Sequence, residues 1–419
     1  VRLVEMRPVR STPAHQTGDL GELVCTNSFK SIDPANAHGQ LKREMGALGS
    51  LLLRVADQAR VAAGSALAVD RERFSQGMTR AVSAHPLIQV VREERTELPP
   101  GPAILATGPL TSDTLSASIR QAVGEEALAF FDAIAPIVHR DSLDEGVVFE
   151  AGRFGEDADY LNCPMSREEY QAFLEGLKAA ELHQGHEFDT VPYFEGCLPI
   201  EVMAGRGDDT LRFGPMKPIG LEDPRTGERP WAVVQLRRED RQGQMWNLVG
   251  FQTRMKIGEQ GRVFRLIPGL ARAEFLRWGS IHRNSYLNFP ARLTPWGSLQ
   301  ERHDLLFAGQ ITGVEGYTES AASGLLAAAN LHRVLQGNGA TLPPPTTMLG
   351  GLYRYLRESK PDHFQPMNSN WGLVDPLPKR IRDKRKKREA LAERAQREFL
   401  EWAAKEEMGL SEASDEGSA

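Results

Sequence analysis

One stretch, residues 305–324, constrains the fold of this chain more than any other. It begins with the short apolar run Leu305 to Ala308, which is typical of a strand buried on both faces. Glycines follow at positions 309, 313 and 316, where the backbone can bend tightly and approach a ligand. Small and aliphatic residues after Thr318 favour a helix. The stretch therefore predicts a strand, a glycine-rich turn and a helix.

The predicted turn has two interpretations. The start of the helix would direct unpaired backbone N–H groups into the turn, and such groups favour an anion or the polarised edge of a ring. An ordinary strand-to-helix connection in any α/β domain has the same pattern. The stretch alone does not separate these interpretations, so the ends of other strands have to be considered.

Two further strand ends suit the same ligand. The run that opens the chain ends in Glu5, and dinucleotide-binding folds place an acid at the end of their second strand to hydrogen-bond the adenosine ribose. Glu5 is equally compatible with an ordinary carboxylate at a strand end. The apolar run at 103–106 leads into Thr107 and Gly108. Ligands of open parallel sheets bind at the carboxyl ends of the strands, so these three ends together predict a dinucleotide site.

The spacing of that acid carries a further expectation. In a dinucleotide-binding domain, this acid follows the glycine loop by about twenty residues. If Glu5 is the acid, the loop precedes residue 1. We therefore expect the sequence to lack the first strand and the glycine loop of its own nucleotide domain.

The periodicity elsewhere predicts a nucleotide domain interrupted by a long insertion. Residues 40–83 have apolar positions at helical spacing. The segment Phe130 to Pro136 is expected to end a helix, Ser166 to open one through a capping box, and residues 230–236 and 245–252 to form an antiparallel pair. We predict an α/β fold with a Rossmann-like domain at 1–112 and 296–375, a mixed α/β insertion at 113–295, and a basic helical tail at 376–419 with a disordered end.

The cysteines point to a reducing compartment, because three are too few for a disulfide scaffold. Cys25 precedes three short hydrogen-bonding residues, a polar setting unlike that of an inert buried thiol, although a half-buried loop thiol also fits. Cys197 follows a glycine and has basic residues nearby in the sequence. Cations lower a thiol pKa from about 8.5 towards neutrality and favour the nucleophilic thiolate. The simplest role for Cys163 is packing.

Charge limits the nucleic-acid interpretations. The net charge of −6 excludes a surface that is basic throughout, but local basic patches remain. One is the run from Lys379 to Arg388, which is either a solvated helix face or a contact for phosphates. The candidate RNA contacts are Arg206, Arg212 and Lys217 in the insertion and Lys384, Arg385 and Lys386 in the tail.

Other chemistry has little support in the sequence. His183 and His186 have a loosely metal-like spacing, but no second ligand cluster accompanies them, so a polar loop is expected and no metal. No P-loop, Cys-x-x-Cys pair, His-Glu-x-x-His or Gly-x-Ser-x-Gly motif occurs. No run of about eighteen apolar residues predicts a membrane span, and no signal-peptide pattern is found.

In combination these segments resemble the bacterial methylenetetrahydrofolate- and FAD-dependent tRNA (uracil-5-)-methyltransferases over nearly the whole chain. The absent N-terminal glycine loop is the one departure. The stretches that carry the resemblance are Glu5-Met6-Arg7-Pro8, residues 22–28 and 160–165 around Cys25 and Cys163, residues 194–201 around Cys197, residues 247–253, His282-Arg283-Asn284, and Gly309 to Tyr317.

The resemblance implies a glutathione-reductase-type FAD domain and a specific reaction. NAD(P)H reduces FAD, and the one-carbon unit of 5,10-methylenetetrahydrofolate passes to C5 of the T-loop uridine (position 54) of tRNA. Cys197 matches the nucleophile and Cys25 the second thiol near the flavin. His282, Arg283 and Asn284 are expected to form the wall on which the pterin stacks. The implied cofactor contacts are Glu5, Arg7, Thr107, Gly108, Gly309, Gln310, Gly313, Glu315, Gly316 and Tyr317.

Three alternatives stay open at this point. One is the related, larger flavoprotein family that modifies wobble uridines, although this chain is too short for its C-terminal helical domain. Another is a tRNA-binding flavoprotein that acts as a folding aid. The third is a plain NAD(P)H–flavin oxidoreductase, which would leave the basic tail unexplained. The favoured reading places a tRNA-binding enzyme in the cytoplasm, with no protein partner evident.

Overall fold

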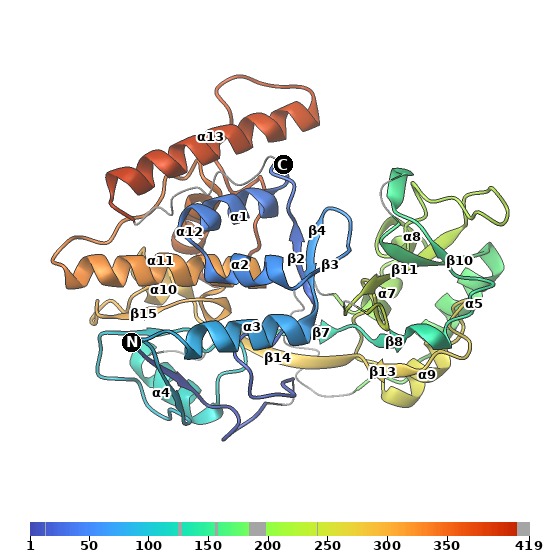
Figure 1. The fold of residues 1–419 in the computed structure, drawn as a ribbon, viewed down its shortest axis with the longest axis horizontal. Coiled ribbons are helices and arrows are strands. Elements are labelled where there is room, and N and C mark those ends of the chain that lie inside the picture. Colours follow the sequence, from blue (N-terminus) through green and yellow to red (C-terminus); the bar gives the residue numbers. More distant parts are fainter. Residues whose placement is uncertain (13, 125–127, 156–157, 184–197, 241, 409–419) are drawn as a thin grey trace.

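The computed structural model describes residues 1–419 except 13, 125–127, 156–157, 184–197, 241 and 409–419; side chains are also left out at 128–134, 280–285 and 363. The chain forms two bodies, which Figure 1 shows side by side. The N-terminal and C-terminal thirds (blue and orange to red) share one body, and the middle of the chain (green to yellow) forms the other. The predicted interruption of one domain by an insertion therefore matches the arrangement in space.

The first body contains two parallel strand pairs surrounded by helices. Strand β1 (Arg2–Glu5) pairs with β5 (Gln89–Arg92), and β6 (Ala103–Leu105) pairs with β15 (Leu305–Phe307). A small antiparallel sheet has the order β2 (Ser28–Ser31), β4 (Ala66–Val69), β3 (Arg60–Val61). The helices are α1 (Ala37–Ala47), α2 (Leu51–Gln58), α3 (Arg71–Ser83), α4 (Asp113–Val123), α10 (Phe289–Arg292), α11 (Tyr317–Leu335), α12 (Met348–Glu358) and α13 (Lys384–Lys405).

One hydrophobic core holds the distant parts of this body together. Leu41 of α1, Phe307 of β15 and Leu326 of α11 are all fully buried in it. Phe399 of α13 is buried in the same core, so the predicted tail helix is docked on the domain. Burial of apolar side chains stabilises by roughly 25 cal/mol per Å², which makes such long-range contacts the main support of the fold.

Helix α4 also contributes to this core through Leu115, Ile119 and Val123. It begins at Asp113, where the insertion was expected to begin. The domain boundaries remain predictions.

The second body is built on an antiparallel sheet. Its strand order is β13 (Phe275–Arg277), β8 (Ile137–His139), β12 (Met245–Leu248), β11 (Ala232–Arg238), β10 (Tyr160–Met165), β9 (Phe149–Glu150). Helices α5 (Arg167–Lys178), α7 (Ile200–Gly205), α8 (Thr210–Phe213) and α9 (Ile257–Phe264) accompany it. The predicted pairing of 230–236 with 245–252 is confirmed by β11 and β12, and the capping box at Ser166 opens α5 as expected. Short 3₁₀ turns are η1 (Arg140–Ser142), η2 (Arg153–Gly155), η4 (Gln310–Thr312) and η5 (Pro361–His363).

A two-stranded antiparallel ribbon connects the bodies. Strand β7 (Leu128–Ile134) pairs with β14 (Ser280–Tyr286), and Figure 1 shows the ribbon running from the helices of the first body towards β8 and β13. The expectation that Phe130 to Pro136 ends a helix was wrong. Aromatic and β-branched residues in this segment favour an extended backbone, and the partner strand supplies its hydrogen bonds.

The expected helical character of residues 40–83 was also wrong in part. Gly49 takes a left-handed conformation (φ 69°), and the Ser50 hydroxyl accepts a hydrogen bond from the backbone N–H of Leu53, so the chain turns and α2 starts afresh. Strands β3 and β4 then separate α2 from α3. Helical spacing of apolar residues did not reveal these interruptions, because two buried strands were hidden in the same apolar pattern.

Across the described ranges, no helix is both long enough and apolar enough to cross a membrane. Within the same ranges, no three His, Cys, Asp or Glu side chains are grouped so that they could hold a metal ion.

Candidate active site

The carboxyl ends of β6 and β15 lie at the same edge of the first body. The backbone N–H of Ala308 donates to the carbonyl of Leu105 over 3.0 Å, which brings Thr107 and Gly108 next to Gly309. Gly108 has a left-handed backbone (φ 69°), and an added Cβ would meet no atom within 4 Å. Two of the three predicted strand ends therefore meet, whereas β1, which ends in Glu5, pairs with β5 in a separate sheet. The space beside Gly108 is open.

The glycine turn is shaped by its own side chains and by packing. The Gln310 side chain donates to Glu315 over 2.5 Å, and the backbone N–H of Glu315 donates to the carbonyl of Met367 over 2.8 Å. Gly313 has φ 88°, and a Cβ there would lie 2.5 Å from the ring of Phe364. Only glycine fits this position, so the turn is held in one shape next to the start of α11.

Gly316 closes the turn. Its φ of 109° is one that side-chain-bearing residues rarely adopt, and an added Cβ would lie 2.5 Å from Oε2 of Glu319. Glycine here lets the backbone pass directly over the first turn of α11.

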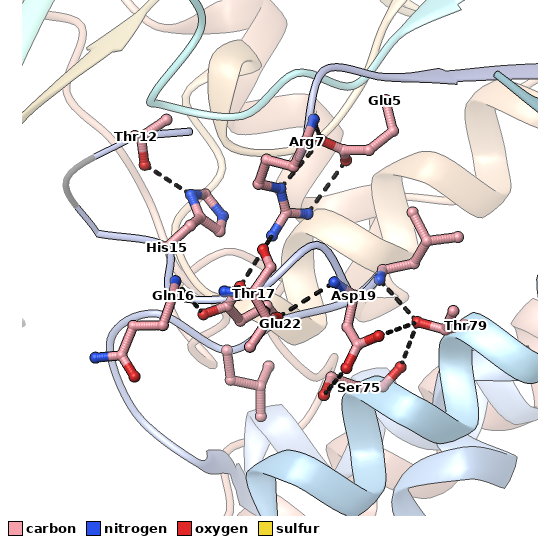
Figure 2. A network of polar contacts seen from close by, with 12 residues as sticks. Glu5, Arg7, Thr12, His15, Gln16, Thr17, Asp19, Glu22, Ser75 and Thr79 are labelled. Carbon is pink, nitrogen blue, oxygen red and sulfur yellow. Dashed lines mark hydrogen bonds and ion pairs between the residues drawn. The ribbon is translucent and has the colours of Figure 1, made fainter. Parts of the chain in front are cut away.

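The acid predicted for the ribose, Glu5, lies at the end of β1 in the network shown in Figure 2. Its two carboxylate oxygens accept hydrogen bonds of 3.0 and 3.2 Å from the guanidinium of Arg7. The same guanidinium donates over 3.1 Å to Glu22, which in turn accepts from the backbone of Gln16 and Thr17. Burial opposes the ionisation of Glu5, but the hydrogen bonds and charge of Arg7 outweigh it and lower the pKa of that carboxyl. Arg7 thus ties the acid to the loop that leads to Cys25.

The loop around Cys25 is fixed by its backbone. The N–H of Cys25 donates to the phenolic oxygen of Tyr317 over 2.8 Å. The carbonyl of Cys25 accepts from Arg71 over 3.1 Å, and Arg71 also donates to the carbonyl of Leu23. The carbonyl of Val24 accepts from Arg277 over 2.8 Å. Side chains from elsewhere in the chain therefore hydrogen-bond to the backbone of Leu23, Val24 and Cys25.

The residues that hold this loop come from both bodies. Arg71 begins α3 in the first body, and its guanidinium lies 2.5 Å from the buried carboxylate of Glu239, which follows β11 in the second. Arg237 of β11 donates to the side chains of Thr26 over 2.7 Å and Asn27 over 3.1 Å. The half-buried thiol of Cys25 is consequently placed where the two bodies meet.

The pKa values of Arg71 and Arg277 are shifted in opposite directions. Burial lowers the pKa of Arg277, and the neighbouring positive charge of Arg71 lowers it further. Burial acts on Arg71 in the same direction, but the carboxylate of Glu239 outweighs it and raises the pKa of that guanidinium. Two cationic groups thus stand at the cysteine loop, where they hold its backbone carbonyls.

A second cluster stands at the start of α11. The fully buried carboxylate of Glu319 accepts from the His38 ring over 3.1 Å and from the backbone N–H of Ser369 over 2.9 Å. The ammonium of Lys30 lies 3.9 Å from the same oxygen. Burial opposes ionisation, but His38 and Lys30 outweigh it and lower the pKa of Glu319 to about 2. Burial in turn lowers the pKa of His38, so a neutral ring donating from Nδ1 fits the pair.

Some predicted site residues cannot be placed in this geometry. Cys197 lies outside the described residues, which resume at Leu198 just before α7. His282, Arg283 and Asn284 lie on β14 with their backbones paired to β7, and their side chains are outside the description. Cys163 is fully buried in the second body, and burial raises the pKa of its thiol to about 12, as a packing role predicts.

The candidate RNA contacts divide by exposure. Arg206 and Lys217 are exposed, and Arg206 lines a groove of about 540 Å³ together with Leu198 and Phe213. Arg212 is engaged within the chain: its guanidinium lies 3.6 Å from the ring centre of Trp231 and ion-pairs with Asp209 at 2.8 Å. Lys384, Arg385 and Lys386 are exposed at the start of α13.

Several side chains that shape the site were not found from the sequence. They are Glu22, Lys30, His38, Arg71, Arg237, Glu239, Arg277 and Glu319. Glu22 and Lys30 carried a usable signal, because they lie three residues before and five residues after Cys25. The others come from separate elements and act through contacts that only folding creates.

Comparison with known proteins gives a consistent result. The family model described as "Glucose inhibited division protein A" matches residues 1–339. Methylenetetrahydrofolate–tRNA-(uracil-5-)-methyltransferase TrmFO of Desulforudis audaxviator is 53% identical over 96% of this chain and 92% of its own length. The enzymes of that name from Syntrophomonas wolfei and Thermus thermophilus are 52% and 51% identical, covering 94% and 96% of this chain and 91% and 90% of their own lengths.

This chain belongs to the methylenetetrahydrofolate–tRNA-(uracil-5-)-methyltransferase family. Identity above half over nearly the whole chain decides it. Among solved structures, Aquifex aeolicus GidA in its form II crystal matches with a TM-score of 0.65 at 15% identity, over 94% of this chain and 68% of that chain. That likeness supports the α/β fold alone. The two bodies, the glycine turn and the Cys25 loop of this chain are therefore those of a family member.

Proposed function

We propose that this protein transfers the one-carbon unit of 5,10-methylenetetrahydrofolate to C5 of a tRNA uridine, with FAD as cofactor and NAD(P)H as reductant. The target is the T-loop uridine at position 54, and the product is ribothymidine. The observation that carries the proposal is the 51–53% identity to methyltransferases of this name over 94–96% of the chain. The reaction places the protein with its tRNA substrate in the cytoplasm.

The residues present fit FAD at both ends of the predicted site. Glu5 uses three of the roughly four acceptor positions of a carboxylate on Arg7, which leaves one for a ribose hydroxyl. At the other end, Gly108 faces open space, and Gly309 to Gly316 bring backbone N–H groups and the start of α11 to the same edge. Thr107, Gln310 and Glu315 border this edge. When bound there, FAD would supply the electrons that reduce the transferred one-carbon unit to a methyl group.

Cys197 is the proposed nucleophile. C5 of uracil reacts poorly with electrophiles until a group adds at C6, and a thiolate is suited to that addition. Cys197 immediately precedes the described start of the α7 region, and Leu198 beside it lines the groove with Arg206.

Cys25 is the proposed second thiol. Its loop is bonded to Tyr317, the residue that follows Gly316 of the glycine turn. The thiol is thereby tied to the wall of the proposed FAD site, where it can exchange a proton or protect the cofactor. The guanidinium groups of Arg71 and Arg277 hold backbone carbonyls of its loop.

The folate and tRNA contacts follow from position. We assign the pterin wall to His282, Arg283 and Asn284, because β14 runs along the ribbon that joins the two bodies. Arg206, Lys217 and the exposed basic start of α13 are assigned to tRNA phosphates, which Lys and Arg bind without regard to sequence. Arg212 has contacts of its own to Trp231 and Asp209, so we expect a smaller contribution from it.

Three cysteine variants test the proposal. Purified Cys197→Ala, Cys25→Ala and Cys163→Ala proteins would be assayed for ribothymidine in a tRNA transcript, with tRNA binding measured in parallel. We expect loss of methylation in the first two with tRNA binding retained, and retention of methylation in Cys163→Ala because that thiol is buried in packing. Full methylation by both Cys197→Ala and Cys25→Ala would overturn the thiol assignments.

Wobble-uridine modification is the alternative function. It is distinguished by mapping the product. Modification at position 34 of the tRNA in place of position 54 would replace the proposed function. A protein that binds tRNA and aids its folding would show neither product.

A further inference from the structure

Lys30 has a backbone conformation that is uncommon for a residue with a side chain. Its φ is 64°, in the left-handed region. The Ser28 hydroxyl accepts the backbone N–H of Lys30 over 3.0 Å, and the Thr318 hydroxyl donates to the carbonyl of Phe29 over 3.2 Å. Such conformations cost of order 1–3 kcal/mol, persist only when surrounding contacts enforce them, and cluster at ligand sites.

The enforced backbone brings the Lys30 side chain to the glycine turn. Its ammonium lies 3.9 Å from Glu319 and 3.4 Å from the position that a Cβ on Gly316 would occupy. The side chain is 37% exposed, so part of it is open to solvent beside Gly316. Three successive residues of α11, Tyr317, Thr318 and Glu319, therefore contact the segment from Cys25 to Lys30.

The charges in this cluster do not cancel. Lys42 joins it through hydrogen bonds of its ammonium to the carbonyls of Ser31 at 3.0 Å and His38 at 3.2 Å. Burial lowers the pKa of Lys42 to about 8, so it stays mainly charged at neutral pH, whereas His38 is neutral. Two ammonium groups face the single carboxylate of Glu319, which leaves one positive charge in excess. The start of α11 adds its partial positive charge at the same place.

We propose that Lys30 is the cation that stabilises the negative charge of reduced FAD in this site. The inference rests on the proposed function, since FAD is the cofactor of that reaction. Hydride transfer from NAD(P)H carries two electrons and one proton to N5 of FAD and yields NAD(P)⁺ and an anionic reduced flavin, with no further proton taken up. That charge resides at the N1–C2 edge of the ring, and a cation at this edge tunes the cofactor.

The expected size of the effect follows from Coulomb's law with solvent screening. The energy of attraction between two unit charges falls as the dielectric constant around them rises. Lys30 is more than one third exposed, which screens most of this energy. We therefore expect a change of about tenfold in the equilibrium between oxidised and reduced FAD, which for a two-electron couple corresponds to about 30 mV.

The test is the reduction potential of the full chain loaded with FAD, measured by equilibration with a redox dye. Lys30→Met should decrease the ratio of reduced to oxidised FAD about tenfold at a fixed potential. Lys30→Arg, which keeps the charge, should stay close to the unsubstituted protein. Lys178→Met, which removes an exposed lysine paired with Asp208 in the second body, should have no effect.

A carboxylate variant gives a test of opposite sign. Glu319→Gln removes the negative charge beside Lys30 and should raise the ratio of reduced to oxidised FAD. An unchanged potential in FAD-loaded Lys30→Met would overturn the proposal. A loss of FAD affinity without a change in potential would also overturn it, because Lys30 would then act on the pyrophosphate.

This measurement needs neither folate nor tRNA. If the unsubstituted protein failed to methylate tRNA, the proposed function would fall while the redox comparison could still be made. The two failures are therefore distinguishable.

Discussion

The backbone N–H of Cys25 donates a 2.8 Å hydrogen bond to the phenolic oxygen of Tyr317, 292 residues away in the sequence. Tyr317 is the first residue of α11 and follows Gly316 directly. The bond therefore joins the loop that carries the proposed second thiol to the turn that forms the wall of the proposed FAD site. The two parts of the site position each other.

Replacement of Tyr317 by Phe should loosen the Cys25 loop. The lost hydrogen bond costs roughly 1 kcal/mol of stability. We expect faster reaction of the Cys25 thiol with an aromatic disulfide reagent, measured in a Cys197→Ala background. Tyr355→Phe is the matched control, because its hydroxyl donates to the carbonyl of Gln365 over 2.8 Å at an exposed site. Equal thiol rates in the two variants would contradict the coupling.

Replacement of Arg71 by Ala should destabilise the contact between the two bodies. The variant leaves the fully buried carboxylate of Glu239 without its 2.5 Å partner and frees the carbonyls of Leu23 and Cys25. Removing one member of a buried pair costs roughly 3–5 kcal/mol. Thermal unfolding followed by circular dichroism would show a clear fall in Tm. Arg397→Ala, from an exposed pair with Glu398, should have little effect.

The Gly316 position should be intolerant of alanine. The new Cβ would lie 2.5 Å from Glu319 at a φ of 109°. A strain of roughly 1–3 kcal/mol corresponds to a loss of FAD affinity of about tenfold or more, measurable by titration of flavin fluorescence. Gly324→Ala in the middle of α11 meets no atom within 4 Å and should stabilise the helix by roughly 0.5–1 kcal/mol. Similar FAD affinities for both variants would argue against the tight turn.

The buried carboxylate of Glu44 should make stability depend on pH. Its oxygens accept the backbone N–H groups of Met348 and Leu349 at the start of α12, each over 2.8 Å. Burial outweighs these bonds and raises the pKa of Glu44 to about 7, above its ordinary value of 4.5. A raised pKa means that the folded chain binds the proton more tightly. Its contribution to stability is therefore complete below about pH 4.5 and is lost as the pH rises through about 7.

Glu44→Gln tests this dependence. The amide does not titrate, so the curve of stability against pH should be flatter for the variant between about pH 4.5 and pH 7. The variant should also be less stable at low pH, because one backbone N–H then faces an NH₂ group. Urea unfolding at a series of pH values would measure both effects. Parallel curves would show that Glu44 does not titrate in this range.

The basic start of α13 should contribute to tRNA affinity through salt-dependent contacts. Double replacement of Lys384 and Lys386 by Gln should weaken binding and reduce the slope of log affinity against log salt by about one for each lost phosphate contact. Lys405→Gln, at the other end of the same helix and 81% exposed, is the control. An unchanged slope in the double variant would remove α13 from the tRNA surface.

Elements that are determined by residues close together in the sequence were predictable. The strand, glycine turn and helix of residues 305–324 depend on residues close in sequence, and the structure forms β15, η4 and α11 there. The capping box of Ser166 and Glu169 is another case, since both partners lie within one helical turn. The meeting of Thr107 with Gly309 was also predictable, because parallel strands place their carboxyl ends at one edge.

Elements whose apolar pattern is compatible with both a helix and a strand were harder to predict. Residues 40–83 carry helical spacing throughout, yet β3 and β4 interrupt them, because β4 pairs with both β2 and β3 and this pairing satisfies backbone groups. Phe130 to Ile134 shows the same limit: its backbone is a strand because β14 lies beside it. In each case a strand that supplies hydrogen bonds, β2 or β14, lies outside the segment, so the local apolar pattern does not reveal it.

The sequence by itself determined the family and the glycine turn. That Cys25 and Cys197 are the reactive thiols stays a prediction. Only the tertiary structure decided what surrounds them: Arg71 against Glu239, Tyr317 against Cys25, and Lys30 against Glu319. The physical reason is that a charge or hydrogen bond acts according to distance and burial in space. Folding brings together groups that no spacing along the chain relates, and it removes the water that would otherwise screen them.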